Sequence, residues 1–214
     1  MLSLTQSVEK HQAVSALTEL SKQIAVCPKC EISKSRTKSV PGEGAENAEI
    51  MFIGEAPGWN EDQQGRPFVG AAGQFLDELI ASINLSRSKV FITNVIKCRP
   101  PNNRDPLPIE ISNCNPWLEE QIKLIAPKII VTLGRYSMSK FFPGKVISKI
   151  HGTFQIVNGV TYFAMYHPAA ALHQGNLRQE LMNDIKKLPV ILEKLKESQQ
   201  VKEAKPESKQ MSMF

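Results

Sequence analysis

The 214-residue chain lacks the features that mark several special classes of protein. No apolar run reaches the roughly 18 residues that a membrane-spanning helix requires. The chain does not begin with a basic start followed by an apolar stretch, so we expect no secretory signal. It has no internal repeats and no Gly-Lys-Ser/Thr sequence of a nucleotide phosphate loop. These absences predict one globular domain inside a cell, where thiols stay reduced.

Charge of neither sign dominates the composition. The chain holds 26 Lys and Arg against 21 Asp and Glu, which gives a formal net charge of +5 at pH 7. This balance permits an anionic partner such as nucleic acid but does not establish one, because a mild positive excess is common on solvated surfaces. Hydrophobic residues make up 42% of the chain, which is ordinary for a globular protein with one buried core.

Cysteine is scarce, and its placement is informative. The chain has only four cysteines, in two pairs: Cys27 with Cys30 in a Cys-Pro-Lys-Cys sequence, and Cys98 with Cys114. In a reducing compartment, paired cysteines favour metals over disulfides. Together they predict one tetrathiolate site that ties the N-terminal segment to the middle of the fold. Their spacing does not choose between zinc and an iron–sulfur cluster, and free buried cysteines are a third interpretation.

Strand-like and helix-like segments alternate along the chain. Strands are predicted over 49–55, 90–95 and 128–133, followed by a hairpin that turns at 158–159. Helices are predicted over 5–25, 70–84, 109–125, 137–142 and 176–197, the last kinked or broken at Pro189. This alternation predicts an α/β fold with a mostly parallel sheet covered on both faces. Residues 198–214 are polar without apolar periodicity, which predicts a disordered tail.

Polar side chains recur where the predicted strands end. Glu55, Asn94 and His167 lie at such ends, and Phe68 lies on the loop after the first of them. Taken singly, each has a structural interpretation as a cap, a small core contact or a surface histidine. Because the carboxyl ends of parallel strands gather at one edge of a sheet, we expect the four to converge on a ligand site. A carboxylate, an amide, an aromatic ring and an imidazole could there bind a flat base and act on it.

Five short segments carry a more specific pattern than any of these residues alone. They are CPKC at 27–30, GEAPGWNED at 54–62, GRPFVGAAG at 65–73, TNVIKCRPPNNRDP at 93–106 and HPAA at 167–170. With these segments in this order, over about residues 15 to 195, the chain resembles the family 4 uracil-DNA glycosylases. This is the iron–sulfur type found in thermophilic archaea and bacteria.

The resemblance implies a fold, a cofactor and a reaction. The fold is an α/β/α three-layer sandwich with a central four-stranded parallel sheet, here as one domain over 1–197 with the tail at 198–214. The cofactor is a [4Fe–4S] cluster on Cys27, Cys30, Cys98 and Cys114. The reaction is hydrolysis of the N-glycosidic bond of deoxyuridine in DNA by a monofunctional base-flipping repair enzyme, which leaves free uracil and an abasic site. We expect a monomer in a prokaryotic cytoplasm, associated with the nucleoid and not with a membrane.

The resemblance also implies roles for the strand-end residues. Glu55 is the water-positioning carboxylate, Phe68 stacks on the flipped uracil, and Asn94 reads the edge of the base. His167 stabilises the negative charge on the departing base, and Glu61 supports either His167 or the loop. Backbone groups of the turn contact the base through Gly54, Ala56 and Gly58.

DNA contacts are expected on two further segments. Arg99 and Arg104, held by the cluster, are candidates for phosphate contacts. Many relatives place Leu-Leu-Arg after HPAA, whereas this chain has Ala-Leu-His. Leu172 is therefore the expected minor-groove wedge, and His173 takes the place of the arginine near phosphate.

Other interpretations stay open at the level of sequence. The chain could be a non-catalytic iron–sulfur or zinc protein that binds nucleic acid. It could also be a broader-specificity glycosylase of the family 5 type, although Glu55 argues against this because family 5 has an apolar residue there. Near the C-terminus, a partial match to the start of a sliding-clamp binding box suggests a clamp as partner. Its residues are Gln210, Met213 and Phe214.

Overall fold

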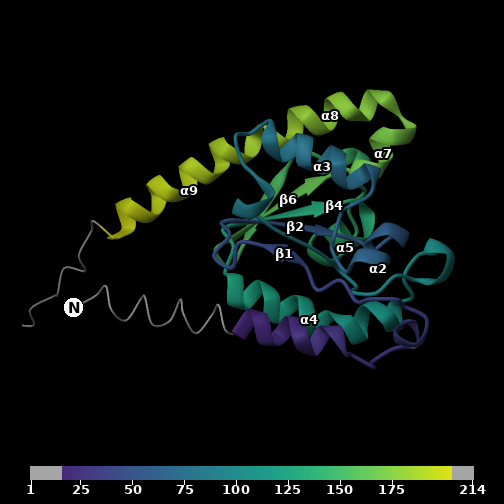
Figure 1. Ribbon diagram of the computed structural model, residues 1–214. Coiled ribbons are helices and arrows are strands. Elements are labelled where there is room, and N and C mark those ends of the chain that lie inside the picture. The colour runs from purple at the N-terminus through teal and green to yellow at the C-terminus, as the bar shows by residue number, and fades with distance from the viewer. Residues whose placement is uncertain (1–15, 204–214) are drawn as a thin grey trace, which may run out of the picture.

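The computed structural model describes residues 16–203, which form one six-stranded sheet with helices on both faces (Figure 1). The strand order is β1-β3-β2-β4-β6-β5. The strands are β1 (Glu43–Gly44), β2 (Ile50–Gly54), β3 (Phe91–Asn94), β4 (Ile129–Leu133), β5 (Phe154–Val157) and β6 (Val160–Met165).

The four inner strands, β3, β2, β4 and β6, are parallel, as the resemblance implied. Each edge carries a short antiparallel strand in addition. On one edge β5 pairs with β6 through the Asn158-Gly159 hairpin that the sequence predicted. On the other, β1 pairs with β3, and its two residues were too few to predict from the sequence.

The helices cover the sheet in two layers. A helix over residues 16–25 precedes the labelled elements. The α-helices are α2 (Trp59–Gln64), α3 (Ala71–Ala81), α4 (Pro108–Ile125), α5 (Arg135–Phe141), α6 (Ile147–Ile150), α7 (Pro168–His173), α8 (Gly175–Ile185) and α9 (Lys187–Glu203). Short 3-10 turns are η1 (Glu31–Lys34), η2 (Arg87–Lys89) and η3 (Pro101–Asn103). In Figure 1, α4 and the 16–25 helix lie below the sheet, and α3, α7 and α8 lie above it.

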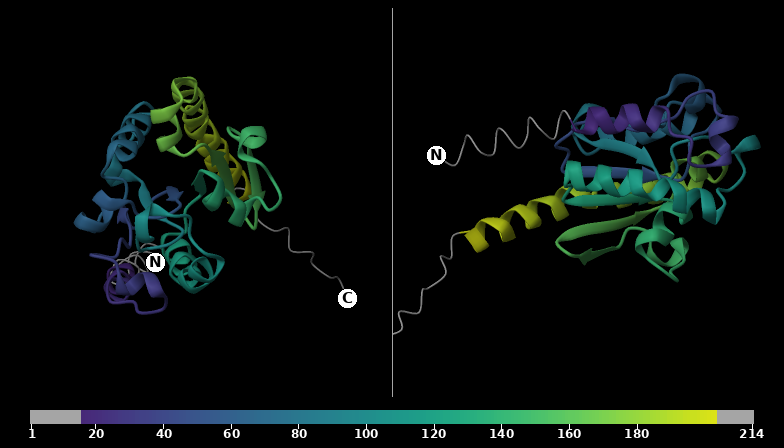
Figure 2. Two further views of the ribbon diagram at one scale, coloured as in Figure 1. Left: turned by 90° about the vertical axis from the view of Figure 1, so that its right-hand side faces the viewer. Right: turned by 90° about the horizontal axis from the view of Figure 1, so that it is seen from below.

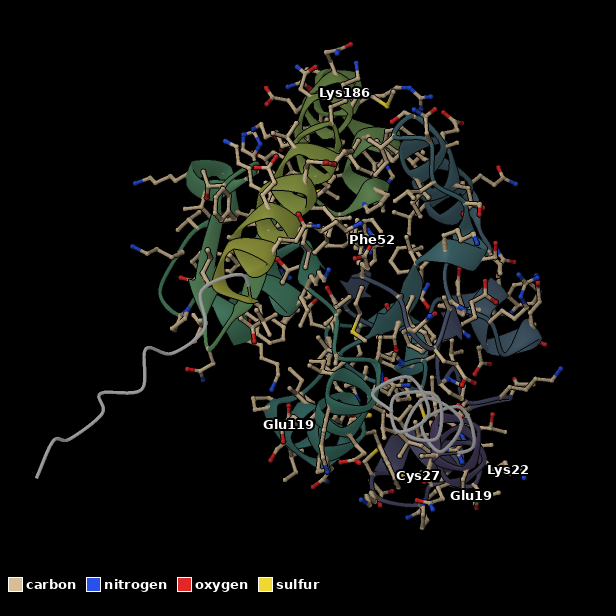
Figure 3. The ribbon with its side chains drawn as sticks, turned by 90° about the vertical axis from the view of Figure 1, so that its left-hand side faces the viewer. Glu19, Lys22, Cys27, Phe52, Glu119 and Lys186 are labelled. Atoms are coloured by element: carbon tan, nitrogen blue, oxygen red, sulfur yellow. The ribbon has the colours of Figure 1, made fainter. Side chains whose placement is uncertain are left out.

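Strand β2 explains how both faces of the sheet become buried. Ile50 and Phe52 point into a core shared with α3 and α8, and Met51 and Ile53 point into a core shared with α4 and the 16–25 helix. Side chains alternate between the two faces of a strand, so an unbroken apolar run is required where both faces are covered. Figure 3 shows Phe52 inside the molecule, with Lys186 near the top of the view and Cys27 near the bottom.

The C-terminal helical segment differs from the prediction in two respects. The break falls at Lys186, between α8 and α9, so Pro189 lies in the first turn of α9, where a missing backbone N–H is tolerated. Helix α9 then continues to Glu203, past the boundary expected at residue 197, and extends away from the body of the protein (Figure 2). Gln210, Met213 and Phe214 lie outside the described residues. Within residues 16–203, none of the helices combines the length and hydrophobicity needed to span a bilayer.

Candidate active site and cysteine site

The strand ends converge on one cavity, as the sequence predicted. Glu55 follows β2, Asn94 ends β3 and His167 follows β6, and all three line a cavity of about 390 Å³ together with Phe68. The turn that follows β2 forms another part of the wall, through Ala56, Pro57 and Gly58. Glu55, Asn94, His167 and Phe68 therefore bring a carboxylate, an amide, an imidazole and a phenyl ring to the same cavity.

The Phe68 ring forms part of the cavity wall. It stacks on His167 with 5.5 Å between ring centroids and 25° between ring planes. Gly54 permits this arrangement, because a Cβ atom there would lie 2.3 Å from Asn94 Oδ1 and 2.6 Å from the Phe68 ring. Of the turn residues expected at the site, Gly54 therefore acts by making room for the two side chains beside it.

Glu61 supports the loops around the cavity. Its Oε2 accepts a hydrogen bond from the Gly58 amide at 3.1 Å. Its Oε1 accepts from the amides of Val69 at 2.8 Å and Gly70 at 3.1 Å. One carboxylate thus joins the turn after β2 to the loop that carries Phe68, which matches the loop-supporting alternative for this residue.

Asn94 carries a buried hydrogen-bonding atom without a partner. The residue is 1% exposed, and its Oδ1 has no hydrogen-bond partner among the described residues. An unpaired buried polar atom costs about 1–3 kcal/mol of folding free energy, so Asn94 lowers the stability of the folded protein. The arrangement fits an amide kept free to bond a ligand in the cavity.

His167 is held as a neutral hydrogen-bond donor. It is the N-cap residue of α7, and its Nδ1 accepts from the Ala169 amide at 3.1 Å. The ring proton therefore resides on Nε2. Burial lowers the pKa of His167 to about 4, against an opposing effect of the Glu61 carboxylate. At neutral pH the residue presents an uncharged imidazole with an N–H to donate.

Glu55 is half-buried at the edge of the cavity. Burial raises the pKa of its carboxyl group, the neighbouring Asp105 carboxylate raises it further, and Arg135 opposes both. Arg135 and Asp105 are themselves paired at 2.7 Å. The sequence interpretation missed this pair, although Arg135 directly follows Gly134 at the end of β4 and so carries the same strand-end signal as Glu55.

The four cysteines also converge. Cys27, Cys30, Cys98 and Cys114 line one small cavity of about 20 Å³, and all are free thiols. Within residues 16–203, no group of three or more His, Cys, Asp or Glu side chains was identified that could hold a metal ion. Burial raises the pKa of Cys114 to about 11, so its thiol is neutral unless a bound cation displaces the proton.

Nitrogen donors point at the sulfur atoms of this cysteine site. The three contacts share a distance of 3.2–3.3 Å and join Arg36 Nη1 to Cys98, the Lys97 amide to Cys114, and Trp117 Nε1 to Cys27. Such donors stabilise negative charge on sulfur, which thiolate ligands carry and thiols do not. The surroundings therefore match a site whose cysteines are deprotonated.

Lys97 connects the cysteine site to the end of β3. Its side chain is 1% exposed, and its Nζ donates to Thr93 Oγ1 at 2.6 Å, to the Asn94 carbonyl at 2.8 Å and to Gln121 Oε1 at 2.6 Å. Three acceptors match the three hydrogens of an ammonium group. The sequence interpretation passed over Lys97 and Gln121, because neither differs in sequence from an ordinary surface residue.

The two arginines expected to contact DNA are engaged within the protein. Arg104 lines the active-site cavity, but its guanidinium forms a two-pronged ion pair with Glu110 at 2.6 and 2.8 Å. Arg99 donates from Nε to Asn103 Oδ1 at 2.6 Å. The Arg104 contact reflects the helix start at Pro108, since Glu110 also accepts from the amide of Leu107, the N-cap residue of α4.

The expected wedge lies on α7. Leu172 is 48% exposed, so its side chain is accessible to a partner. His173 is also exposed and ends the same helix, which begins next to His167. The two residues thus stand near the cavity on one short helix.

Comparisons with known proteins find relatives of this chain. A family model described as the Uracil DNA glycosylase superfamily matches residues 41–187. The type-4 uracil-DNA glycosylase of Sulfurisphaera tokodaii is 50% identical over 184 residues, which cover 81% of this chain and 83% of the relative. That of Archaeoglobus fulgidus is 45% identical over 182 residues, covering 81% and 92%. A type-5 uracil-DNA glycosylase of Pyrobaculum aerophilum is 30% identical over 167 residues, covering 69% and 74%.

Proposed function

This chain belongs to the uracil-DNA glycosylase superfamily and to its type-4 members, which excise uracil from DNA in repair, and we propose that the strand-end cavity is its active site. The observation that carries this proposal is the unpaired, buried Asn94 amide oxygen beside the stacked rings of Phe68 and His167. A flat base that enters the cavity can stack on the phenyl ring. Its N3–H can then donate to Asn94 Oδ1 while its O4 accepts from the amide nitrogen.

Base recognition comes before bond cleavage in this proposal. The deoxyuridine leaves the DNA stack at a cost of about a few kcal/mol, which is lower in a weak or mismatched pair. Stacking on Phe68 and the paired hydrogen bonds to Asn94 offset this cost. Because both groups are buried and fixed, they favour one orientation of the base, with its glycosidic bond directed toward Glu55.

Cleavage separates charge between the sugar and the base. As the bond between C1′ and N1 breaks, positive charge develops on the sugar and negative charge develops on uracil O2. His167 donates from Nε2 to that oxygen, and Glu55 orients a water molecule toward C1′ and stabilises the cation. The water oxygen joins C1′, Glu55 receives the proton, and the base leaves as the uracil anion, which takes up a proton from solvent. An abasic site remains in the DNA.

Replacing Asn94 with aspartate tests the recognition step. A carboxylate cannot donate to uracil O4, so we expect uracil excision to fall by about one to two orders of magnitude, as for the loss of a bidentate base contact. Excision of cytosine should become measurable, because its amino group can donate to the carboxylate. Uracil release at the wild-type rate would contradict the assignment. Asn183→Asp, on the exposed surface of α8, serves as the control.

We also propose that the four cysteines hold a [4Fe–4S] cluster. Four thiol groups around one cavity, with three nitrogen donors directed at their sulfur atoms, fit this group. When bound, it supplies a covalent link between the 27–30 and 98–114 segments. Arg36 places positive charge beside Cys98, and the Lys97 backbone amide donates to Cys114. The link would fix the loop that leaves β3 just after Asn94.

Iron and sulfide analysis checks the cluster. An anaerobic preparation should be brown and contain iron and acid-labile sulfide in equal amounts. Cys114→Ser should lose most of the colour and unfold at a markedly lower temperature, since metal binding at a structural site contributes directly to folding. Glu31→Gln, next to Cys30 but exposed and paired only with Lys34, should retain both properties. A colourless protein that contains zinc would contradict the cluster.

The DNA surface is proposed to surround the cavity mouth. Leu172 would fill the gap left by the flipped base, and His173 and Arg99 would lie near phosphates. Arg104 would take part by orienting the 99–107 loop through Glu110 or by exchanging that carboxylate for a phosphate. We further propose a monomer that acts on nucleoid DNA in a prokaryotic cytoplasm. Binding to a sliding clamp through 210–214 is open to a pull-down with and without these residues.

A further inference from the structure

The loop over residues 67–70, here called the Phe68 loop, holds its central residue in an unusual backbone conformation. Phe68 has a φ of 51°, in the left-handed region that residues with a side chain rarely adopt. Its ring is nevertheless buried and stacked on His167. The neighbouring helix approaches closely, since a Cβ atom at Gly73 would lie 1.9 Å from the Phe68 carbonyl oxygen. Something must therefore keep this backbone from relaxing.

Arg87, in η2, contacts the carbonyl side of the Phe68 loop. Its Nη1 donates to the Phe68 carbonyl oxygen at 3.1 Å, and its Nη2 donates to the carbonyl oxygen of Pro67. No other donor within residues 16–203 bonds to either oxygen. A planar guanidinium can serve two neighbouring carbonyl groups at once, which an ammonium group cannot do with the same geometry.

Two carboxylates hold Arg87 in place. Its Nη1 bonds to Asp77 at 2.8 Å, and its Nε bonds to Glu43 on the edge strand β1. The side chain of Arg87 is only 19% exposed. Burial raises the pKa of Glu43, but hydrogen bonds from Arg66 and Arg87 outweigh this effect and lower it. Glu43 is therefore ionised, and the two-residue strand β1 has the effect of fixing its position.

The amide groups of the Phe68 loop bond to a negative charge, the carboxylate of Glu61. Glu61 accepts from the amides of Val69 and Gly70, directly after the two carbonyl groups that Arg87 binds. The loop is thus held between a cation at its carbonyl groups and an anion at its amides. Arg87 donates to the carbonyl oxygens and Glu61 accepts from the amides. Phe68, the residue with a positive φ, lies between these two sets of contacts.

We propose that Arg87 is a positioning residue for uracil excision, which holds Phe68 in the backbone conformation that places its ring under the base. The proposal rests on the stacking role of Phe68 in the proposed function. Arg87 itself lies behind the loop and touches no substrate. It acts through the two carbonyl groups, while Glu43 and Asp77 fix the direction of its guanidinium.

The test compares three variants by steady-state excision, inhibition by free uracil and thermal unfolding. Arg87→Met should lower kcat about 100-fold, the effect of a displacement near 1 Å at a reacting group. It should weaken inhibition by free uracil about tenfold, which is within the range of a lost base–aromatic contact. Arg87→Lys should recover part of both losses, because one point donor replaces the fork. Arg66→Gln is the control, because the Arg66 side chain is exposed and bonds to Glu43 but not to the carbonyl groups that Arg87 binds.

The outcomes separate this inference from the proposed function. Wild-type protein that releases no uracil would overturn the proposed function itself. Wild-type activity together with unchanged kcat and unchanged uracil inhibition in Arg87→Met would overturn the role of Arg87. Equal losses in Arg87→Met and Arg66→Gln would also overturn it, because Glu43 and not the loop contact would then be responsible. If Arg87→Met does not fold, Arg87→Lys provides the test. Reduced kcat and weaker uracil inhibition in Arg87→Lys would support the role of Arg87, and wild-type values of both would overturn it.

Discussion

Replacing His167 with alanine is expected to lower kcat for uracil release by about two to three orders of magnitude. The reason is that Nε2 provides a preorganised donor to the oxygen on which negative charge develops, and removal of one such donor typically has this effect. Single-turnover kinetics with saturating enzyme on a deoxyuridine duplex measures the loss. His173→Ala is the matched comparison on the same helix, with an expected rise in KM and a retained kcat. A kcat within twofold of wild type in His167→Ala would remove its catalytic role.

We also expect His167 to make the stability of the protein depend on pH. Burial lowers the pKa of His167 to about 4, whereas the pKa of a histidine in an unfolded chain is about 6.5. Between these values the unfolded state binds a proton that the folded state does not bind. Stability therefore falls as the pH drops from about 6.5 toward 4. His167→Gln should flatten this part of the stability profile, which urea unfolding at several pH values would measure.

Replacing Glu55 with glutamine should lower kcat by about two orders of magnitude or more while DNA binding is retained or strengthened. A neutral amide can no longer receive the proton of the attacking water or stabilise the sugar cation, and general-base contributions have this size. Loss of a negative charge at the DNA-facing edge should also favour the phosphate backbone. Quenched-flow excision together with binding to a noncleavable deoxyuridine analogue separates the two effects. Unaltered turnover would contradict the role of Glu55.

The pH profile gives an independent check on Glu55. Burial and the neighbouring Asp105 raise its pKa, so activity should decline on the acid side at a pH above that of an ordinary glutamate. Activity is lost as the pH falls through this pKa, because the protonated carboxyl group cannot act as a base. Asp105→Asn removes a like charge and frees Arg135, so it should move the acid limb to lower pH. An acid limb that stays in place would contradict this electrostatic coupling.

The convergence of the strand-end residues could be predicted from the sequence because of the topology of a parallel sheet. Glu55, Asn94 and His167 each follow a strand that reads clearly as apolar, and parallel strands gather their carboxyl ends at one edge. The two cysteine pairs could likewise be joined, because four thiols without disulfide partners suggest one shared site. Each of these signals can be read from a short segment of the sequence, without knowledge of the tertiary packing.

The groups that support the site could not be predicted in the same way. Arg87 bonds to the Phe68 loop and Glu43 bonds to Arg87, and both read in sequence as ordinary charged surface residues. Glu61 was expected to support the loop or His167 only because of the family resemblance. Charged residues are most often solvated, so only tertiary packing distinguishes these from the rest. Strand β1 escaped prediction for a related reason, because its two residues are fixed by pairing with β3 and not by their own propensity.

Arg104 shows how a side chain can have a partner that the sequence does not reveal. It was predicted as a candidate for phosphate contacts, and in the structure it lines the cavity and bonds to Glu110. Glu110 is needed for the start of α4, since it accepts from the Leu107 amide. The helix cap and the arginine therefore share one buried carboxylate, which a sequence pattern does not reveal.

The central claim is that the cavity of Glu55, Asn94, Phe68 and His167 hydrolyses the glycosidic bond of deoxyuridine. The most direct measurement is mass-spectrometric detection of free uracil from a duplex with one deoxyuridine, in excess EDTA, beside an identical duplex with thymidine. The account predicts uracil release from the first duplex only, an intact strand until the abasic site is cleaved by alkali, and no release by a Glu55→Gln, His167→Ala double variant on the same timescale. Tight binding of the deoxyuridine duplex without any release of uracil by the wild-type protein would contradict it.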